Sequence, residues 1–195
     1  MVMAATETDK TWNILMVGVG GQGIILASDI LAAAALTAGF DAKKSEIHGM
    51  SQRGGSVFSH VRFGKKIFSP VIPEGGADVL LSLELMETLR WTAFAHAGTE
   101  FIVLNEKILP ANTESYPEGV EKEINSLSPG AILLDPAFLI EKIGDKKYLN
   151  VALCGILAGK LTLPEAAWRE AVNTHVPAGS FEANWQAFGT GRTLA

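Results

Sequence analysis

The chain has 195 residues, of which 48% are hydrophobic and 19% charged, and its formal net charge is −5 at pH 7. Its length fits one globular domain, and its acidic balance argues against general nucleic-acid binding, which usually needs a basic face. Cys154 is the only cysteine, which excludes an intrachain disulfide and an iron–sulfur cluster held by about four thiolates of this chain alone.

The sequence carries no recognisable targeting signal. Residues 1–10 are polar and acidic, unlike a signal peptide. No stretch reaches the roughly 20 apolar residues of a membrane span. We therefore expect a cytoplasmic protein without membrane partners, in which residues 1–195 form one domain and residues 1–11 a flexible N-terminal tail.

The first quarter of the chain alternates between strand and helix signals. The apolar run 14–17 stops at glycine and predicts a buried strand over residues 13–17. Residues 23–38 are mostly Ala, Leu and Ile and predict a helix that needs cover on most sides, with Gly39 as its C-terminal stop. Residues 42–47 predict a second, more polar strand.

A hairpin is predicted next. Residues 56–63 alternate in polarity, and Gly64-Lys65-Lys66 then leads into residues 67–69. This pattern favours an antiparallel pair with a lysine-rich turn, whose second arm is limited by Pro70 and Pro73.

The remaining chain continues the alternation and ends in helices. Further strands are predicted at 78–83, 100–104 and 131–134, and helices at 85–97, 150–161, 164–175 and 181–188. Continuous apolar strands alternating with helices imply a parallel sheet covered on both faces. The predicted fold class is therefore α/β: a single three-layer Rossmann-like domain with a mostly parallel sheet and one antiparallel hairpin.

The first motif is Gly18-Val19-Gly20-Gly21-Gln22-Gly23, between the first strand and the first helix. Glycine permits positive φ and close approach of a ligand, and the helix N-terminus supplies partial positive charge. A dinucleotide site also needs an acidic residue about 20 positions later, and Glu46 near that offset lies among basic residues. Two interpretations stay open: phosphate or cofactor contact, or glycines that only permit close packing. The motif is not a P-loop, because no Gly-Lys-Ser/Thr follows.

The second motif is His48-Gly49-Met50-Ser51-Gln52-Arg53-Gly54-Gly55. Arg53 offers a planar fork suited to carboxylate or phosphate, and His48 can donate to the same anion or carry a proton. Alternatively, Arg53 pairs with Glu84 or Glu87 and His48 caps a turn. A structural role is favoured for His48, whereas the loop position of Arg53 favours contact with a ligand or another subunit.

These two motifs carry a family resemblance. Residues 13–62, with Glu46-Ile47-His48 leading directly into the second motif, resemble the gamma-type domain of 2-oxoacid:ferredoxin oxidoreductases, and within that family the beta subunits of the indolepyruvate type. The resemblance extends over nearly the whole chain, through Ser69-Pro70, Ala77-Asp78-Val79-Leu80, Leu83-Glu84, Leu89-Arg90 and Asn105.

The resemblance implies a subunit of an enzyme that oxidatively decarboxylates an arylpyruvate with coenzyme A, giving aryl-acetyl-CoA, carbon dioxide and reduced ferredoxin. Thiamine diphosphate and [4Fe-4S] clusters would be carried by a larger alpha subunit, and ferredoxin would meet the complex. This chain would have no catalytic or metal-binding residues and would be inactive alone. Its expected cofactor-binding residues, near the coenzyme A phosphates, are Gly18, Gly20, Gly21, Gln22, Gly23, His48, Gly49, Ser51, Arg53, Gly54 and Gly55.

Two other functions remain open. One is a stand-alone oxidoreductase that binds NAD or FAD at Gly18–Gly23, and the other is a purely structural subunit. The isolated chain is also expected to form a homodimer, because its apolar helices would lose their cover. Cys154 is expected to be a buried, inert thiol, and Asp135 either faces a ligand at a strand end or caps a turn.

Overall fold

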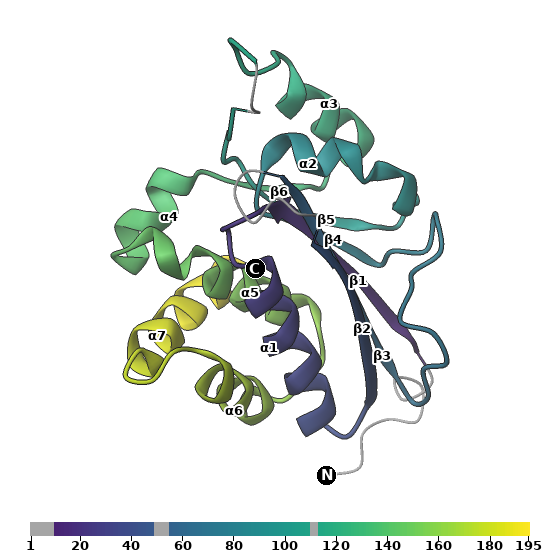
Figure 1. Cartoon of the computed structure of the whole chain (residues 1–195), viewed down its shortest axis with the longest axis vertical. Coiled ribbons are helices and arrows are strands. Elements are labelled where there is room, and N and C mark those ends of the chain that lie inside the picture. Colours follow the sequence, from purple (N-terminus) through teal and green to yellow (C-terminus); the bar gives the residue numbers. More distant parts are fainter. Residues whose placement is uncertain (1–9, 49–54, 110–112) are drawn as a thin grey trace.

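One six-stranded sheet organises the protein in this computed structural model, which describes residues 10–48, 55–109 and 113–195, with only the backbone of residues 47 and 48. The strand order is β2-β3-β1-β4-β5-β6 (Figure 1). The strands are β1 (Trp12–Val19), β2 (Asp41–His48), β3 (Ser56–Gly64), β4 (Val79–Ser82), β5 (Glu100–Leu104) and β6 (Ile132–Leu134). β1, β4, β5 and β6 are parallel, and β3 is antiparallel to both β1 and β2.

Helices cover both faces of the sheet. They are α1 (Ile24–Thr37), α2 (Leu85–Arg90), α3 (Val120–Leu127), α4 (Pro136–Ile143), α5 (Leu149–Lys160), α6 (Glu165–His175) and α7 (Phe181–Arg192), with short 3-10 turns η1 (Thr92–Phe94) and η2 (Lys146–Tyr148). α1, α5, α6 and α7 gather on one side and α2 and α3 on the other (Figure 1). The predicted α/β class is confirmed. In the described ranges, no helix has both the length and the apolar character needed to cross a bilayer.

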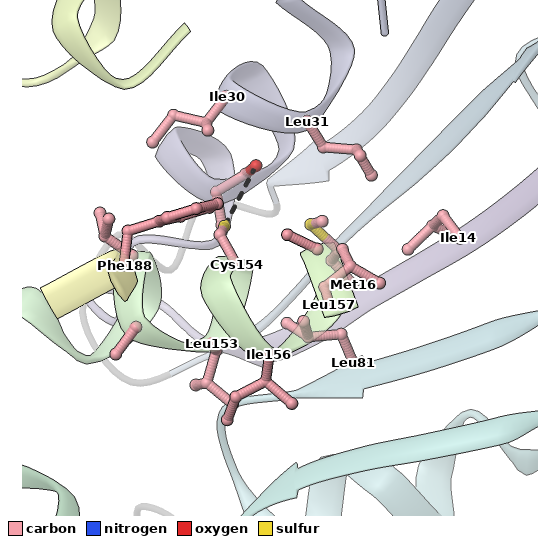
Figure 2. Close-up of a cluster of buried hydrophobic side chains, with 14 of the residues drawn as sticks. Ile14, Met16, Ile30, Leu31, Leu81, Leu153, Cys154, Ile156, Leu157 and Phe188 are labelled. Carbon is pink, nitrogen blue, oxygen red and sulfur yellow. Dashed lines mark hydrogen bonds between the residues drawn. The ribbon is translucent and has the colours of Figure 1, made fainter. Parts of the chain in front are cut away.

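β1 explains why the run 14–17 is apolar without interruption. Ile14 and Met16 point into the core under α1 and α5, whereas Leu15 and Val17 point into the core under α2 and α3. A strand buried on both faces has no solvent-facing alternation to show. Cys154 lies in the larger core with its Sγ 3.8 Å from the carbonyl oxygen of Ala27 (Figure 2). The expected burial of Cys154 is confirmed, and complete burial raises the pKa of this thiol to about 12, as expected for an unreactive thiol.

The antiparallel hairpin exists, but its predicted arms were wrong. Its two strands are β2 and β3, so the second glycine segment is the connection between them. Residues 67–69 form no strand; instead the Ile67 amide donates to Asp41 Oδ2 at 2.9 Å. The chain leaves the sheet after Gly64, and Pro70 has no amide proton to offer a ladder.

The middle of the chain holds two helices that the prediction missed and one that it made too long. The helix expected at 85–97 ends at Arg90 and gives way to the 3-10 turn η1. α3 buries only Val120 and Ile124, too few for a clear apolar period. α4 starts at a proline, and its cap is the Asp135 carboxylate, which accepts from the Phe138 amide at 2.9 Å. The capping interpretation of Asp135 is therefore confirmed.

Candidate cofactor-binding site

The first glycine motif lies at the carboxyl edge of the parallel strands, where β1 passes into α1. Its neighbour β4 passes into α2, which covers the opposite face of the sheet. Open α/β sheets bind ligands at such a switch point, because the two connections diverge there and leave a crevice. The fold thus puts the first motif where a ligand is expected.

Two of the motif glycines serve packing and turn closure. A Cβ on Gly18 would lie 2.7 Å from Gln22 Oε1 and 2.9 Å from Ile24 Cδ1, so no larger residue fits without displacement. The amide of Gly20 is already used, because it donates to the carbonyl oxygen of Gly55 at 2.8 Å. These contacts favour the packing interpretation for Gly18.

The other two glycines have backbone conformations that disfavour any side chain. Gly23 caps α1 with φ 82°, and a Cβ there would collide with the Asn150 amide. Gly21 has φ 99°, yet nothing lies within 4 Å of the Cβ position. Gly21 therefore leaves open space beside the helix N-terminus, as ligand approach requires.

Gln22 closes the crevice between β1 and β4. Its Oε1 accepts from the Val19 amide at 2.7 Å, and its Nε2 donates to the carbonyl oxygen of Leu83 at 2.6 Å. The side chain therefore ties the first turn to the end of β4. A ligand must bind outside this bridge, on the side where α1 begins.

A cavity of about 580 Å³ occupies that side, a volume within the usual range for small-molecule sites. It is lined by Gly20, Gly21, Gln22, Gly23, Leu26, Leu83, Leu104, Glu106, Ile108, Asp145, Lys146, Lys147, Leu149 and Asn150. The α1 N-terminus has no side-chain cap and no acidic residue in its first turn. Its amide groups and positive dipole end thus remain available to an anion.

The cavity is lined by two carboxylates and two lysines, so its formal charges balance. Lys147 Nζ lies 3.1 Å from Asp145 Oδ2, and hydrogen bonds from the Lys147 amide and side chain hold the pKa of the Asp145 carboxyl below its usual value. Glu106 contributes a carboxylate and Lys146 a cation. Among the residues that the structure describes, Lys146 has no ion-pair partner, so its charge remains available to a ligand.

The second glycine segment is anchored beside the first at its C-terminal end. Gly55 accepts from Gly20, and the next residue, Ser56, donates from its hydroxyl to Glu87 Oε2 at 2.5 Å. His48 is described only as backbone, paired with Val57 in the hairpin. The expected site residues Gly49, Ser51, Arg53 and Gly54 lie outside the described residues.

The two carboxylates considered as partners for Arg53 both have other partners. Glu87 accepts from Ser56, from Arg90 Nε at 2.9 Å and from Trp91 Nε1 at 3.2 Å. Glu84, only 2% exposed, accepts from the amides of Glu87 and Ile108 at 2.8 and 3.2 Å. Both groups act as structural acceptors in the described part of the chain.

The sequence prediction missed the contacts that hold the cavity lining in place. Glu84 also accepts from the Tyr116 hydroxyl at 2.6 Å, and burial together with this carboxylate raises the pKa of Tyr116. These bonds hold the segment around Ile108 against the start of α2. Asn150 donates to the carbonyl oxygen of Gly23 at 3.2 Å and joins α5 to the start of α1. A local sequence pattern has no signal for pairs so far apart along the chain.

The structure disfavours the dinucleotide interpretation. Glu46 lies on β2, which β3 separates from β1, and accepts from Lys44 at 3.0 Å. It is therefore not on the strand beside β1, where the ribose-binding carboxylate of a dinucleotide fold is needed. No group of three or more potential metal ligands occurs among the described residues.

Comparisons with known proteins agree with this architecture. Residues 13–194 match the family described as "Pyruvate ferredoxin/flavodoxin oxidoreductase". "Indolepyruvate oxidoreductase subunit IorB" of Archaeoglobus fulgidus is 41% identical over 176 residues, which cover 84% of this chain and 87% of that protein.

Two solved structures share the fold. The gamma subunit of a keto/oxoacid ferredoxin oxidoreductase from Geobacter sulfurreducens superposes with a TM-score of 0.70 at 25% identity, over 95% of this chain and 96% of that one. A 2-oxoglutarate:ferredoxin oxidoreductase from Magnetococcus marinus, with 2-oxoglutarate, coenzyme A and succinyl-CoA bound, gives a TM-score of 0.75 at 19% identity, over 96% of this chain but 31% of that one. The predicted resemblance is thus confirmed, and the chain belongs to the pyruvate ferredoxin/flavodoxin oxidoreductase family.

Proposed function

We propose that this chain is the small subunit of a cytoplasmic arylpyruvate:ferredoxin oxidoreductase that acts on indolepyruvate and related 2-oxoacids. The complex would convert the 2-oxoacid and coenzyme A to aryl-acetyl-CoA and carbon dioxide while reducing ferredoxin. Support comes from the 41% identity to a subunit named for indolepyruvate over most of both chains.

In this proposal the redox chemistry belongs to a larger alpha subunit that carries thiamine diphosphate and [4Fe-4S] clusters. A cluster needs several accessible thiolates, whereas this chain has one cysteine and buries it completely. The described residues also include no cluster of metal-ligating side chains. The donor set therefore does not fit a cluster, and the chain's own residues would serve binding and assembly.

The cavity at the first glycine turn is our candidate contact for a coenzyme A phosphate. The observation that carries this assignment is the open space at Gly21 beside the uncapped start of α1. Backbone amides and a positive dipole end form a ready anion site, and exposed Lys146, which lines the cavity, adds a positive charge. The apolar lining from Leu26, Leu83 and Leu104 suits a ligand that is not purely ionic.

The second glycine segment would complete that site from the neighbouring connection. Its anchor at Gly55 lies against the first turn, so the segment starts and ends at the same edge of the sheet. In this proposal Arg53 binds phosphate or carboxylate through its planar fork. His48, Gly49, Ser51 and Gly54 would supply hydrogen bonds and room around it.

Co-expression with the larger subunit tests the function. We expect a stable complex that reduces ferredoxin only when an arylpyruvate and coenzyme A are both present, and Arg53→Ala should raise the KM for coenzyme A. A complex that turns over equally well without this chain would contradict the proposal.

A structural role is the second candidate, and specific contacts favour it for part of the motif. Gly18 and Gly23 are packed tightly, and the Gly20 amide is already bonded. If both glycine segments are purely structural, Gly20→Ala and Arg53→Ala should leave turnover and coenzyme A affinity unchanged in every complex that assembles.

A further inference from the structure

A well-anchored apolar segment lies at the other end of the sheet from the cavity. Residues 65–73, which we call the strap, run from the end of β3 towards β4. β3 pairs Ser56 with Val19 beside the cavity and Phe63 with Trp12 near the strap. At about 3.4 Å per residue, the two ends are more than 20 Å apart. The strap therefore has a role separate from ligand contact in the cavity.

Polar groups of the sheet hold the strap backbone in place. Arg62 Nη1 donates to the carbonyl oxygens of Ser69 and Val71 at 2.9 and 3.2 Å. Its Nε donates to Asn13 Oδ1 at 2.7 Å, which fixes the guanidinium itself. The amide of Ile72 donates to His60 Nδ1 at 3.2 Å. A backbone held at several points loses little further entropy when another molecule binds it.

The side chains of the strap divide between the core and solvent. Ile67 and Ile72 are buried, at 3% and 0% exposure, whereas Phe68 is 88% exposed and Val71 53%. A single exposed apolar residue needs no explanation. Here, however, two outward apolar side chains stand on a backbone that hydrogen bonds to side chains of the sheet hold in place, an arrangement that favours contact with another protein.

The charge around the strap indicates the kind of partner. Residues 62–74 contain the cations Arg62, Lys65 and Lys66 but only one carboxylate, Glu74, in a chain whose net charge is −5. Asp41 offsets part of this charge, at 3.6 Å from Lys66 Nζ. Two copies of the strap meeting across a two-fold axis would bring like charges together. A different protein with an acidic rim fits better than a second copy.

We propose that the strap docks this subunit onto the larger subunit, with Phe68 inserted into an apolar socket that carboxylates surround. The inference rests on the proposed function, which supplies that partner. The same fold makes up only 31% of the Magnetococcus marinus chain, so there it is covalently joined to a much larger remainder. A separate small subunit has to replace that covalent link with a surface.

The test compares Phe68→Ser with Leu36→Ser, a control on α1 whose side chain is 56% exposed. Each variant is mixed with the larger subunit, and the dissociation constant is measured by analytical ultracentrifugation. We expect Phe68→Ser to raise the dissociation constant at least about tenfold, as loss of a central aromatic anchor does, and Leu36→Ser to change it less than about twofold. Lys65→Glu combined with Lys66→Glu should also weaken assembly, and more so at low salt.

The outcomes separate this inference from the proposed function. Equal dissociation constants for Phe68→Ser and the unaltered chain would overturn the docking role and leave the function standing. Loss of a homodimer of the isolated chain, with the heteromeric complex unaffected, would assign the strap to self-association and also overturn it. If the unaltered chain does not bind the larger subunit at all, the proposed function itself fails.

Discussion

Glycine serves opposite purposes in two regions of this molecule. Where α5 and α7 cross, a Cβ on Gly155 would collide with the backbone oxygen of Phe188, and one on Gly191 with that of Ala152. At the first turn, Gly21 leaves its Cβ position open at φ 99°. The crossing uses glycine to remove space between helices, and the turn uses it to keep space beside a helix end. A glycine therefore has a predictable function only when its surroundings are known.

The largest expected effect is at the helix crossing. Gly155→Ala should lower the free energy of unfolding by about 3 kcal/mol, because the added methyl overlaps backbone that cannot rotate away. Gly189→Ala on α7 is the matched control, because nothing lies within 4 Å of its Cβ position; it should be neutral or stabilising by up to about 1 kcal/mol. Urea unfolding measures both, and similar losses would show that the crossing has no special packing.

Loss of the Gln22 bridge between the first turn and the end of β4 should lower stability by a smaller amount. Gln22→Ala removes both side-chain hydrogen bonds and leaves the Val19 amide without its acceptor, so we expect a loss of about 2 kcal/mol. Gln186→Ala, on the exposed side of α7, is the control and should change stability by less than about 0.5 kcal/mol. If Gln22→Ala is as stable as its control, the bridge does not close the crevice.

His60 makes the stability of the folded chain depend on pH. Burial, reinforced by the positive charge of Arg62, lowers the pKa of this imidazole. The unfolded chain therefore binds the proton more readily, and stability should fall as the pH falls through about 6.5, levelling off below the folded-state pKa. Thermal midpoints between pH 8 and 5 measure the loss. The stability of His60→Gln should depend less on pH in this window, and an unchanged pH dependence would contradict the contribution of His60.

The parts of the fold that local patterns determine were predictable. Gly39 ends α1 with φ 90°, and the amides of Gly39 and Phe40 bond back to Leu36 and Ala35, as a glycine-terminated helix requires. The buried β1 was equally clear, because a strand covered on both faces is continuously apolar. The hairpin was misassigned because the second glycine segment looked like a ligand loop, although it also connects β2 and β3.

The position of the candidate site could be predicted from the sequence, but the roles of its individual residues could not. The motif fixed its place after β1, yet nothing in Gly18, Gly21 and Gly23 distinguishes packing from open space. Asn150 lies 127 residues after Gly23 and meets it only because α5 returns to the start of α1. Local residue patterns carry no information about such meetings, which depend on the topology of the whole sheet.

Coenzyme A binding to the assembled complex tests the central claim most directly. Gly21→Ala and Gly39→Ala form a matched pair, because both glycines have positive φ, both have nothing within 4 Å, and they flank opposite ends of α1. Each should lower subunit stability by about 1–2 kcal/mol. We predict that only Gly21→Ala weakens coenzyme A binding, by about tenfold, or about 1.4 kcal/mol. Unchanged affinity in Gly21→Ala, or equal weakening in both, would contradict a ligand site at the first turn.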